Sequence, residues 1–449
     1  MADEIKINRS EGTTIITPIV IPRPEHKISR ANISENAVKV LYRLKNAGFQ
    51  AYLVGGGVRD LLLGREPKDF DIATDAHPEE VRRVFSNCRL IGRRFRLAHV
   101  HFGRDIVEVA TFRGNVDPDA DVDHESENGM LLRDNVYGSI EEDAIRRDFT
   151  VNALYYNIED FSVVDYVDGV KDLEAGVLRL LGDPETRYRE DPVRMLRAVR
   201  FAAKLGFLIN PQCEKPIFEL GDLLDDIPAA RLFEEVLKLF MGGVSLNTFE
   251  KLRHYDLFGR LFPDTEEYLS HEEFGFPVTF VNRGLENTDN RIAEGKPVTP
   301  AFLFAVLLWE PVRQMANRMM ANGDSPLQAM QQAGNEIVFR QSQRIAIPKR
   351  FSLPMREIWN LQHRFTQRNG KRPLRLLSHP RFRAAYDFLL LRAEGGETEM
   401  ELANWWTEFQ EASEEDKNRM MSQPKGDSEG VKRKRRRRRK PKVKKQDQE

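Results

Sequence analysis

Apolar residues near the start of the chain recur at the spacing of an α-helix. Val38, Leu41 and Leu44 fall on one side of such a helix, and the polar residues between them would face solvent. Ser34 stands just before this pattern and is a favoured N-terminal cap, whereas Gly48 stands where helices commonly end. The pattern therefore predicts a helix between Ser34 and Gly48.

Shorter apolar stretches follow and predict strands. Residues 52–54 lead into a run of three glycines, and residues 97–102 and 106–112 alternate polar with apolar side chains. The order strand, glycine turn, helix, strand is typical of a domain that mixes α and β structure.

Helical periodicity replaces the strand signal from about Asp172 onward. It is clear in three stretches, at Val193, Leu196 and Val199, at Leu232, Val236 and Leu239, and at Phe382, Tyr386 and Leu389. We therefore predict an α+β fold, in which a head with a small mixed sheet and helices precedes an all-α neck and body and a disordered basic tail. The predicted bounds are 1–30 for an extended arm, 31–170 for the head, 171–262 for the neck, 263–412 for the body and 413–449 for a linker and tail.

The composition describes a globular chain without a membrane anchor. Of 449 residues, 41% are hydrophobic and 31% are charged, and the apolar run from Phe302 to Trp309 is too short to span a bilayer. The N-terminus lacks the basic start and apolar stretch of a signal peptide, so we expect a cytoplasmic protein with no integral membrane association. Cys88 and Cys213 lie far apart without metal-ligand spacing, which predicts reduced thiols and no zinc site.

Charge is distributed unevenly along the chain. The net charge of −1 conceals a terminal segment, residues 432–449, whose twelve basic and two acidic residues carry +10 and leave −11 for the rest. This segment has almost no apolar side chain to bury, so we expect it to be disordered and to attract polyphosphates in a salt-sensitive way. A solubilising tail is the alternative, but mixed-sign charge would serve solubility better than a block of one sign.

Two aspartates separated by one residue are the strongest chemical signal. In a strand, Asp69 and Asp71 would share one face while Phe70 and Ile72 turn to the other. Two carboxylates placed in this way suit hard divalent cations. The glycines at 55–57 would let the backbone turn sharply and present N–H groups to a phosphate near the start of a helix. For either feature alone, a glycine turn or two solvated aspartates is the alternative.

A third acidic group is expected wherever two aspartates hold two metal ions for nucleotidyl transfer. Glu108 is the first candidate because it lies among apolar residues in a predicted strand, where a lone acid is either solvent-facing or functional. Asp148 is the second candidate and follows Arg146 and Arg147, whose guanidinium groups suit phosphate oxygens. Asp148 and the nearby Asn152 could also bind ribose hydroxyls, but this motif could equally cap a helix.

A basic strip is predicted on a later helix. Arg194, Arg197 and Arg200 recur every three residues and would lie on one side of it. Asp191 lies one turn before Arg194, so a carboxylate and a guanidinium together could read the edge of a nucleobase. Asp191 also precedes Pro192, and starting the helix is at least as strong an explanation for it.

A second basic cluster precedes the strand predicted at residues 97–102. Arg93, Arg94 and Arg96 surround Phe95. This arrangement predicts contact with a triphosphate or an RNA backbone, with Phe95 placed for stacking. A basic surface turn is the alternative.

Four motifs together resemble the class II nucleotidyltransferases, the family of tRNA CCA-adding enzymes and bacterial poly(A) polymerases. They are Gly55-Gly56-Gly57-Val58-Arg59-Asp60, Asp69-Phe70-Asp71, Arg146-Arg147-Asp148-Phe149-Thr150 and Glu190-Asp191-Pro192-Val193-Arg194. The resemblance covers roughly residues 18–410. Within the family, residues 90–97 are similar to a segment that marks the bacterial poly(A) polymerases. The long helical body with an arginine-rich tail also resembles these enzymes.

The resemblance implies a head related to DNA polymerase beta, a neck that selects the incoming base and a body that grips RNA. It implies two Mg²⁺ held by Asp69 and Asp71. Asp148 matches a family active-site residue, whereas the assignment of Glu108 as third carboxylate depends more on its position in a strand. Nucleotide-binding residues would be Gly55, Gly56, Arg59, Arg147, Asn152, Asp191, Arg194 and Arg197. RNA-binding residues would be Arg93, Arg94, Arg96, Arg435, Arg436 and Arg437.

The activity that the resemblance implies is template-independent addition of AMP from ATP to RNA 3′ ends, the poly(A) tailing that promotes RNA processing and decay. RNA-decay or RNA-chaperone proteins are expected as further partners, and a monomer is the expected state. A CCA-adding tRNA nucleotidyltransferase shares every catalytic motif and is the first alternative. A non-catalytic RNA-binding protein is the second, and the intact Asp69 and Asp71 argue against it.

Overall fold

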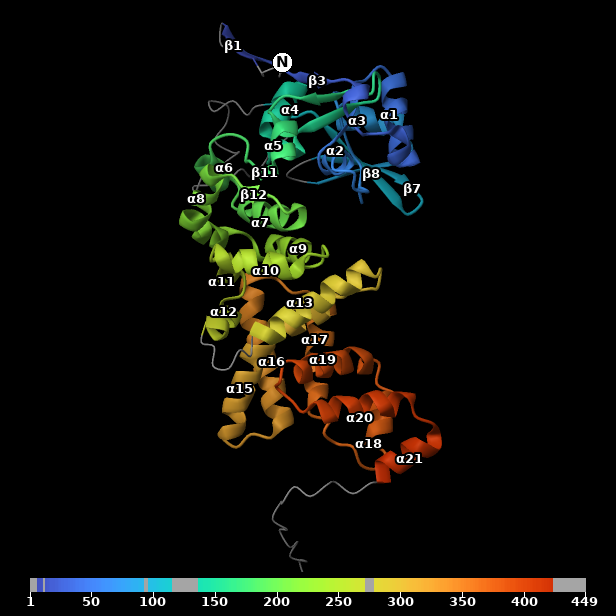
Figure 1. The fold of residues 1–449 in the computed structure, drawn as a ribbon, viewed down its shortest axis with the longest axis vertical. Helices are drawn as coiled ribbons and strands as arrows, with labels where there is room; N and C mark the ends of the chain where they lie inside the picture. Colours follow the sequence, from blue (N-terminus) through green and yellow to red (C-terminus); the bar gives the residue numbers. More distant parts are fainter. Residues whose placement is uncertain (1–5, 11–12, 93–95, 115–135, 271–277, 423–449) are drawn as a thin grey trace, which may run out of the picture.

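The computed structural model describes residues 6–10, 13–92, 96–114, 136–270 and 278–422. The molecule is elongated, with the sheet at one end and helices stacked below it (Figure 1). The first strands lie at the sheet end and the last helices at the opposite end. The predicted α+β class, a mixed sheet followed by helices, is confirmed.

The sheet is mixed and has the strand order β3-β10-β9-β4-β5-β8-β7-β6. Its neighbours are antiparallel except for β5 and β8, which run parallel. A parallel pair needs a crossover, and here the chain passes through helix α3 and strands β6 and β7 before it returns as β8. The strands are β3 (Ile19–Ile21), β4 (Ala51–Val54), β5 (Asp71–Thr74), β6 (Cys88–Ile91), β7 (Leu97–Phe102), β8 (Asp105–Thr111), β9 (Leu154–Asn157) and β10 (Val163–Asp165).

The predicted first helix is present as α1 (Glu35–Asn46), and the Ser34 hydroxyl accepts a hydrogen bond from the Ala37 N–H as its cap. Its buried face is formed by Ala37, Val40, Leu41 and Leu44, so Val38 lies beside this face and is only half-buried. Helix α1 packs on β4, β5 and β8, and α3 (Pro78–Val84) packs on β6, β7 and β8. A second small core on the sheet joins Val54, Ala73 and Tyr155 to helix α4 (Ile140–Arg146).

Residues 1–30 were predicted as an extended arm, and strands form within its described part before a short 3₁₀ helix at Arg23–Glu25. Strand β1 (Lys6–Ser10) forms a hairpin with β2 (Thr13–Thr17), and β3 joins the main sheet beside β10. The extended N-terminal segment thus contributes an edge strand to the main sheet.

Helices follow the sheet, as predicted, with one exception. A two-residue parallel pair, β11 (Val177–Leu178) and β12 (Leu208–Ile209), lies within the predicted neck. Strands this short have no periodicity for a sequence pattern to show. The helices of this part are α5 (Gly169–Ala175), α6 (Pro184–Glu190), α7 (Val193–Leu205), α8 (Pro211–Leu220), α9 (Ala229–Phe240), α10 (Ser245–His254) and α11 (Leu257–Leu261).

Most of the remaining helices extend the same apolar core away from the sheet, whereas Leu376, Tyr386 and Trp406 belong to a separate core of the last helices. Phe258 and Phe262 stack, and Phe262 also packs on Phe304, so the core continues across the boundary predicted at 262 and 263. The helices are α12 (Pro263–Ser270), α13 (Val278–Ala293), α14 (Pro300–Leu307), α15 (Trp309–Ala321), α16 (Pro326–Arg344), α17 (Lys349–Gln362), α18 (Arg372–Leu377), α19 (Phe382–Glu394) and α20 (Met400–Glu411). Within the part of the chain that is described, no helix is long and apolar enough to cross a bilayer.

One segment differs from its prediction as a polar linker. Residues 414–422 form helix α21 (Glu414–Ser422), and the Ser413 hydroxyl accepts a hydrogen bond from the Asp416 N–H at its start. Lys417 pairs with Glu414 one turn away at 3.4 Å. Capping and ion pairing stabilise a helix that buries no residue of its own, which a search for apolar periodicity cannot detect.

Candidate active site

A tight turn after strand β4 carries the glycine motif. Gly55 has a φ of 69°, in the left-handed region that favours glycine, and helix α2 (Gly56–Leu62) follows it. A Cβ atom at Gly55 would lie 3.6 Å from Arg147 Nη1 and 4.0 Å from Asp71 Oδ2. The turn therefore brings the backbone close to a guanidinium and a carboxylate that the sequence analysis singled out.

Asp71 begins strand β5 and lies opposite Glu108 on the parallel neighbour β8. Burial raises the pKa of Asp71 to about 6, and the negative charges of Glu108 and Asp69 act in the same direction, against Arg147. Two further carboxylates are thus near enough to Asp71 to repel its negative charge. Their mutual repulsion would be relieved by a bound cation.

Asp143 on helix α4 holds Arg147 in place. Its Oδ2 atom accepts hydrogen bonds from Arg147 Nη2 at 2.9 Å and from the Tyr155 hydroxyl at 2.6 Å. Burial opposes ionisation of Asp143, but the charge of Arg147 and these hydrogen bonds more than offset it, so the pKa of Asp143 is lowered. Arg147 is thereby fixed beside Asp71 with its charge available to the cavity.

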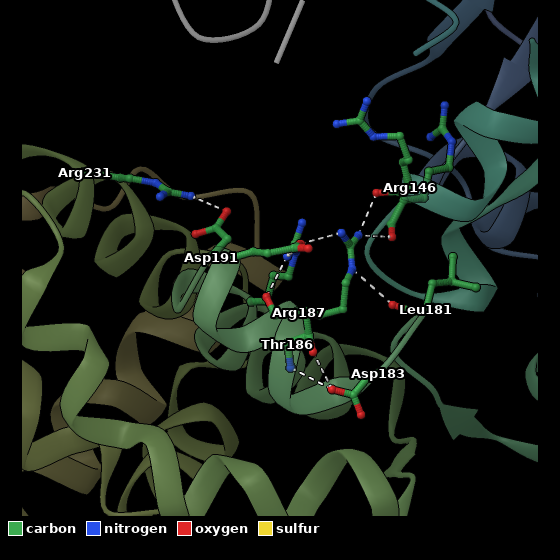
Figure 2. A network of polar contacts seen from close by, with 10 residues as sticks. Arg146, Leu181, Asp183, Thr186, Arg187, Asp191 and Arg231 are labelled. Atoms are coloured by element: carbon green, nitrogen blue, oxygen red, sulfur yellow. Dashed lines mark hydrogen bonds and ion pairs between the residues drawn. The ribbon is translucent and has the colours of Figure 1, made fainter. Parts of the chain in front are cut away.

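Arg187 on helix α6 ties the helical part to the same segment of the head (Figure 2). Its Nη2 atom donates to the carbonyl oxygens of Arg146 at 2.8 Å and Arg147 at 2.9 Å, and its Nε atom donates to the Leu181 carbonyl at 3.1 Å. Glu190 accepts from its remaining nitrogen at 2.6 Å. One partly buried guanidinium therefore connects the backbone at residues 146–147 with the backbone at residue 181.

Asp148 is committed to an ion pair with Arg197 of helix α7. Arg197 Nε donates to Asp148 Oδ2 at 2.9 Å, while Asp148 Oδ1 accepts from Asn152 Nδ2 at 3.1 Å and from the Phe149 N–H at 2.8 Å. Burial opposes the charged form, but Arg197 and these hydrogen bonds lower the pKa of Asp148 to about 2. Both carboxylate oxygens of Asp148 are thus already in use within the protein.

Arg59, which was predicted to bind the nucleotide, is enclosed in the protein. Its side chain is 2% exposed and donates to Asp60 Oδ1 at 2.7 and 2.9 Å and to Asn152 Oδ1 at 2.6 Å. Its guanidinium carbon also lies 5.2 Å from the centre of the Phe201 ring. Arg59 therefore belongs to an internal network behind the cavity, because helix α2 turns it toward α7 rather than toward solvent.

Helices α7 and α9, together with Asp191 at the end of α6, supply charged side chains opposite the sheet. Arg231 of α9 donates to Asp191 Oδ2 at 2.7 Å (Figure 2). Arg194 Nη1 donates to Glu190 Oε2 at 2.8 Å and to the Arg187 carbonyl at 2.6 Å. Asp191 and Arg194 are thus held by different partners, whereas the motif suggested that the two would act together as one carboxylate and guanidinium.

A cavity of about 460 Å³ lies between the sheet and these helices. Asp71 and Glu108 line it from the strands, Arg147 and Asp148 from the segment after α4, and Asp191, Arg194, Arg197 and Arg231 from the helices. The structure therefore brings together charged residues that are separated by up to 164 positions in the chain, from Asp71 to Glu235 of helix α9. Asp69, Gly55, Gly56, Arg59 and Asn152 are not among the residues that line the cavity.

The predicted strip on α7 is divided among three environments. Arg194 binds Glu190, Arg197 binds Asp148, and the Arg200 guanidinium carbon lies 4.4 Å from the centre of the Phe201 ring. Of the predicted RNA-binding residues, Arg96 pairs with Glu79 at 2.7 Å. Arg93, Arg94, Arg435, Arg436 and Arg437 lie outside the described residues.

Asp143 and Arg231 are among the residues of this site that were missed in the sequence analysis. Asp143 stands four residues before Arg147, and this helical spacing was a usable signal for an ion pair. Arg231 stands 40 residues after Asp191 with no local pattern that connects them. Only the packing of α9 against α7 brings Arg231 to the cavity.

A cavity with clustered carboxylates on a sheet, faced by arginines, is the arrangement of a nucleotidyltransferase. Three family models match this chain. Residues 51–179 match the model described as "Poly A polymerase head domain", and residues 206–269 match "Probable RNA and SrmB- binding site of polymerase A". Residues 322–441 match "Polymerase A arginine-rich C-terminus". Poly(A) polymerase I of Salmonella typhi is 53% identical over 410 residues, which cover 90% of this chain and 88% of that protein. The chain therefore belongs to the poly(A) polymerase I family.

Other relatives agree with this membership. Poly(A) polymerase I of Haemophilus influenzae is 48% identical over 93% of this chain and 94% of its own length. The CCA-adding enzyme of Bacillus subtilis is 39% identical, but over only 54% of this chain and 59% of its own length. Among solved structures, the Bacillus stearothermophilus CCA-adding enzyme in complex with CTP has a TM-score of 0.54 at 23% identity, covering 87% of this chain and 88% of that one. This last likeness shows the fold.

Proposed function

We propose that this chain is a template-independent polynucleotide adenylyltransferase, which adds AMP from ATP to the 3′-hydroxyl ends of RNA. The observation that carries the proposal is the cavity itself, where Asp71 and Glu108 face the arginines of α7 and α9. The membership in the poly(A) polymerase I family, over about nine-tenths of the chain, supports the same activity.

In the proposed reaction, the 3′-oxygen of the RNA attacks the α-phosphorus of ATP and forms a new phosphodiester bond. The bond from that phosphorus to the oxygen bridging to the β-phosphate breaks, and pyrophosphate leaves. Arg147 lies where it can bind triphosphate oxygens, since Asp143 and Tyr155 fix its guanidinium beside Gly55. Glu108, whose side chain is 48% exposed, is proposed to accept the hydroxyl proton.

Two Mg²⁺ are proposed to bind at Asp69 and Asp71. Among the residues that the structure describes, no three His, Cys, Asp or Glu side chains are close enough to hold an ion alone. Mg²⁺ commonly takes one or two carboxylates and completes its shell with substrate phosphates and water, so this donor set fits. The raised pKa of Asp71, caused by burial and by the charges of Glu108 and Asp69, is consistent with a site that gains from a cation. When bound, the ions would stabilise negative charge on the attacking and leaving oxygens.

Asp148 is proposed as a positioning residue rather than as the third carboxylate. Its oxygens are bound by Arg197, Asn152 and the Phe149 N–H, whereas Glu108 lies opposite Asp71 and opens to the cavity. The neck residues Asp191, Arg194 and Arg197 are proposed to contact the adenine base from the other wall. We further propose that the enzyme is a cytoplasmic monomer and that RNA-decay or RNA-chaperone proteins are its partners.

The test is extension of an unstructured RNA oligonucleotide and of a tRNA that lacks its terminal CCA, with magnesium and one nucleoside triphosphate at a time. Long ladders with ATP alone on the oligonucleotide are expected. Asp71→Ala should abolish incorporation while RNA binding stays within about twofold, since Asp71 lies in the cavity and not on the helical body. Two additions from CTP and then one from ATP, confined to tRNA, would instead identify a CCA-adding enzyme. A wild-type protein that binds RNA but extends neither substrate would contradict both activities.

A further inference from the structure

One row of paired residues crosses three strands of the sheet at the cavity. Glu108 on β8 lies opposite Asp71 on one side and opposite His99 of β7 on the other. Residues that pair directly across neighbouring strands place their side chains on the same face. His99 therefore belongs to the same face as the two carboxylates, although no part of the proposed reaction yet uses it.

The contact between His99 and Glu108 is close. His99 Nε2 lies 3.2 Å from Glu108 Oε1, and the His99 side chain is 16% exposed whereas that of Glu108 is 48% exposed. The imidazole is thus the more enclosed of the two groups. The histidine side chain also has two rotatable bonds, compared with three for the glutamate. Less conformational entropy is therefore lost when the histidine is held in one position.

The Nε2 atom of His99 has no exposed surface and makes no well-oriented hydrogen bond to any residue that the structure describes. A buried polar atom in this state gains by meeting a partner. Glu108 Oε1 lies at hydrogen-bonding distance, so a hydrogen bond forms once the two side chains are aligned. Such a bond would hold the carboxylate in one orientation at the cavity wall.

We propose that His99 is a positioning residue, which holds the Glu108 carboxylate in the orientation that receives the proton of the RNA 3′-hydroxyl. This inference rests on the proposed function, because it assigns a role within that reaction. His99 itself touches neither substrate. Strand β7 begins two residues before His99, so the imidazole is carried by regular sheet backbone rather than by a loop.

The experiment compares His99→Ala and His99→Gln with the matched control His101→Gln. His101 lies on the same face of the same strand, with its ring 6.3 Å from that of His99, and it is opposite Ile106 rather than Glu108. His99→Ala should lower kcat for AMP incorporation about 10-fold, by analogy with the lower end of the loss seen when a partner that orients a metal-binding side chain is removed. KM for ATP and the unfolding temperature should stay near wild type. His99→Gln should recover most of the loss because its amide can donate to Glu108, and His101→Gln should match wild type.

A second arm separates positioning from a structural role. Glu108→Asp draws the carboxylate back by one methylene, so adding His99→Ala to it should lower kcat by less than about twofold more. The inference is overturned if His99→Ala keeps wild-type kcat, if it causes the same loss of about 10-fold beside Glu108→Asp, or if the loss comes with a lower unfolding temperature. AMP incorporation by the wild-type protein tests the proposed function separately. Absence of AMP incorporation by wild type would overturn that function, whereas active wild type with an equally active His99→Ala overturns only the role of His99.

Discussion

Asp148 and Arg197 form an ion pair that joins the sheet-containing head to helix α7. The two residues stand 49 positions apart, and both line the cavity. Because Asp148 lies on one wall of the proposed nucleotide site and Arg197 on the other, the ion pair fixes the position of the two walls relative to each other.

Breaking this pair should affect both stability and nucleotide choice. Asp148→Asn removes the charge that Arg197 binds, and we expect about 2 kcal/mol less stability, the size of a hydrogen bond to a charged group. The ratio of kcat/KM for ATP to that for CTP should fall, since Arg197 is released from its position. Glu185→Gln is the matched control because its ion pair with Arg189 is exposed, and it should change neither quantity. Unchanged ATP preference in a folded Asp148→Asn protein would show that the pair does not shape the site.

The same carboxylate predicts a dependence on pH. The pKa of Asp148 is lowered to about 2 by Arg197 and by hydrogen bonds that outweigh burial, compared with an ordinary value of 3.8. A group with a depressed pKa in the folded state contributes stability above its ordinary pKa and loses that contribution as pH falls toward the folded value. The stability difference between wild type and Asp148→Asn, measured by urea unfolding, should therefore be constant from about pH 7 to 5 and shrink between about pH 4 and 2. A difference that stays constant throughout this acid range would contradict the assignment.

Asp143→Asn should weaken the binding of ATP. Arg147 would lose the carboxylate that orients it, and a charge-assisted hydrogen bond of about 1.5 kcal/mol corresponds to about tenfold in KM. Steady-state kinetics with ATP measures the change, and Glu141→Gln on the same helix is the control. A fall in kcat with unchanged KM would instead place Arg147 in the chemical step alone.

Arg59→Met tests whether Arg59 acts on the nucleotide or on the fold. The substitution leaves Asp60 buried beside Lys204 at 3.4 Å and removes the bond to Asn152. We therefore expect about 3 kcal/mol of lost stability, measured by urea unfolding. The protein that remains folded should keep a KM for ATP within about twofold of wild type. A stable variant with a strongly raised KM for ATP would instead show that Arg59 acts in nucleotide binding.

Removal of residues 432–449 should weaken RNA binding in a salt-dependent way while AMP incorporation continues. Every RNA phosphate that the shortened chain no longer neutralises should reduce the slope of log K against log salt by about 0.7. Binding measured between about 50 and 300 mM salt tests this expectation. A truncated protein with an unchanged slope would show that these residues do not contact RNA.

The sequence by itself determined the class of fold and most of the chemical groups in the cavity. Periodicity located helix α1 and the strands, and the motifs singled out Asp71, Arg147 and Arg197. These features depend on neighbours within a few positions, because helix capping, strand alternation and a glycine turn are local effects.

Only the tertiary structure decided which partner each of these groups meets. Two acids, Glu108 and Asp148, stood as candidates for one role in the sequence, and strand pairing places the first beside Asp71 while helix packing gives the second to Arg197. Arg59 and Arg147 look alike in their motifs, yet one is enclosed and the other lines the cavity. Such differences arise because the register of β5 against β8 and the packing of α7 against the head join residues some 40 or 50 positions apart, beyond the reach of any local pattern.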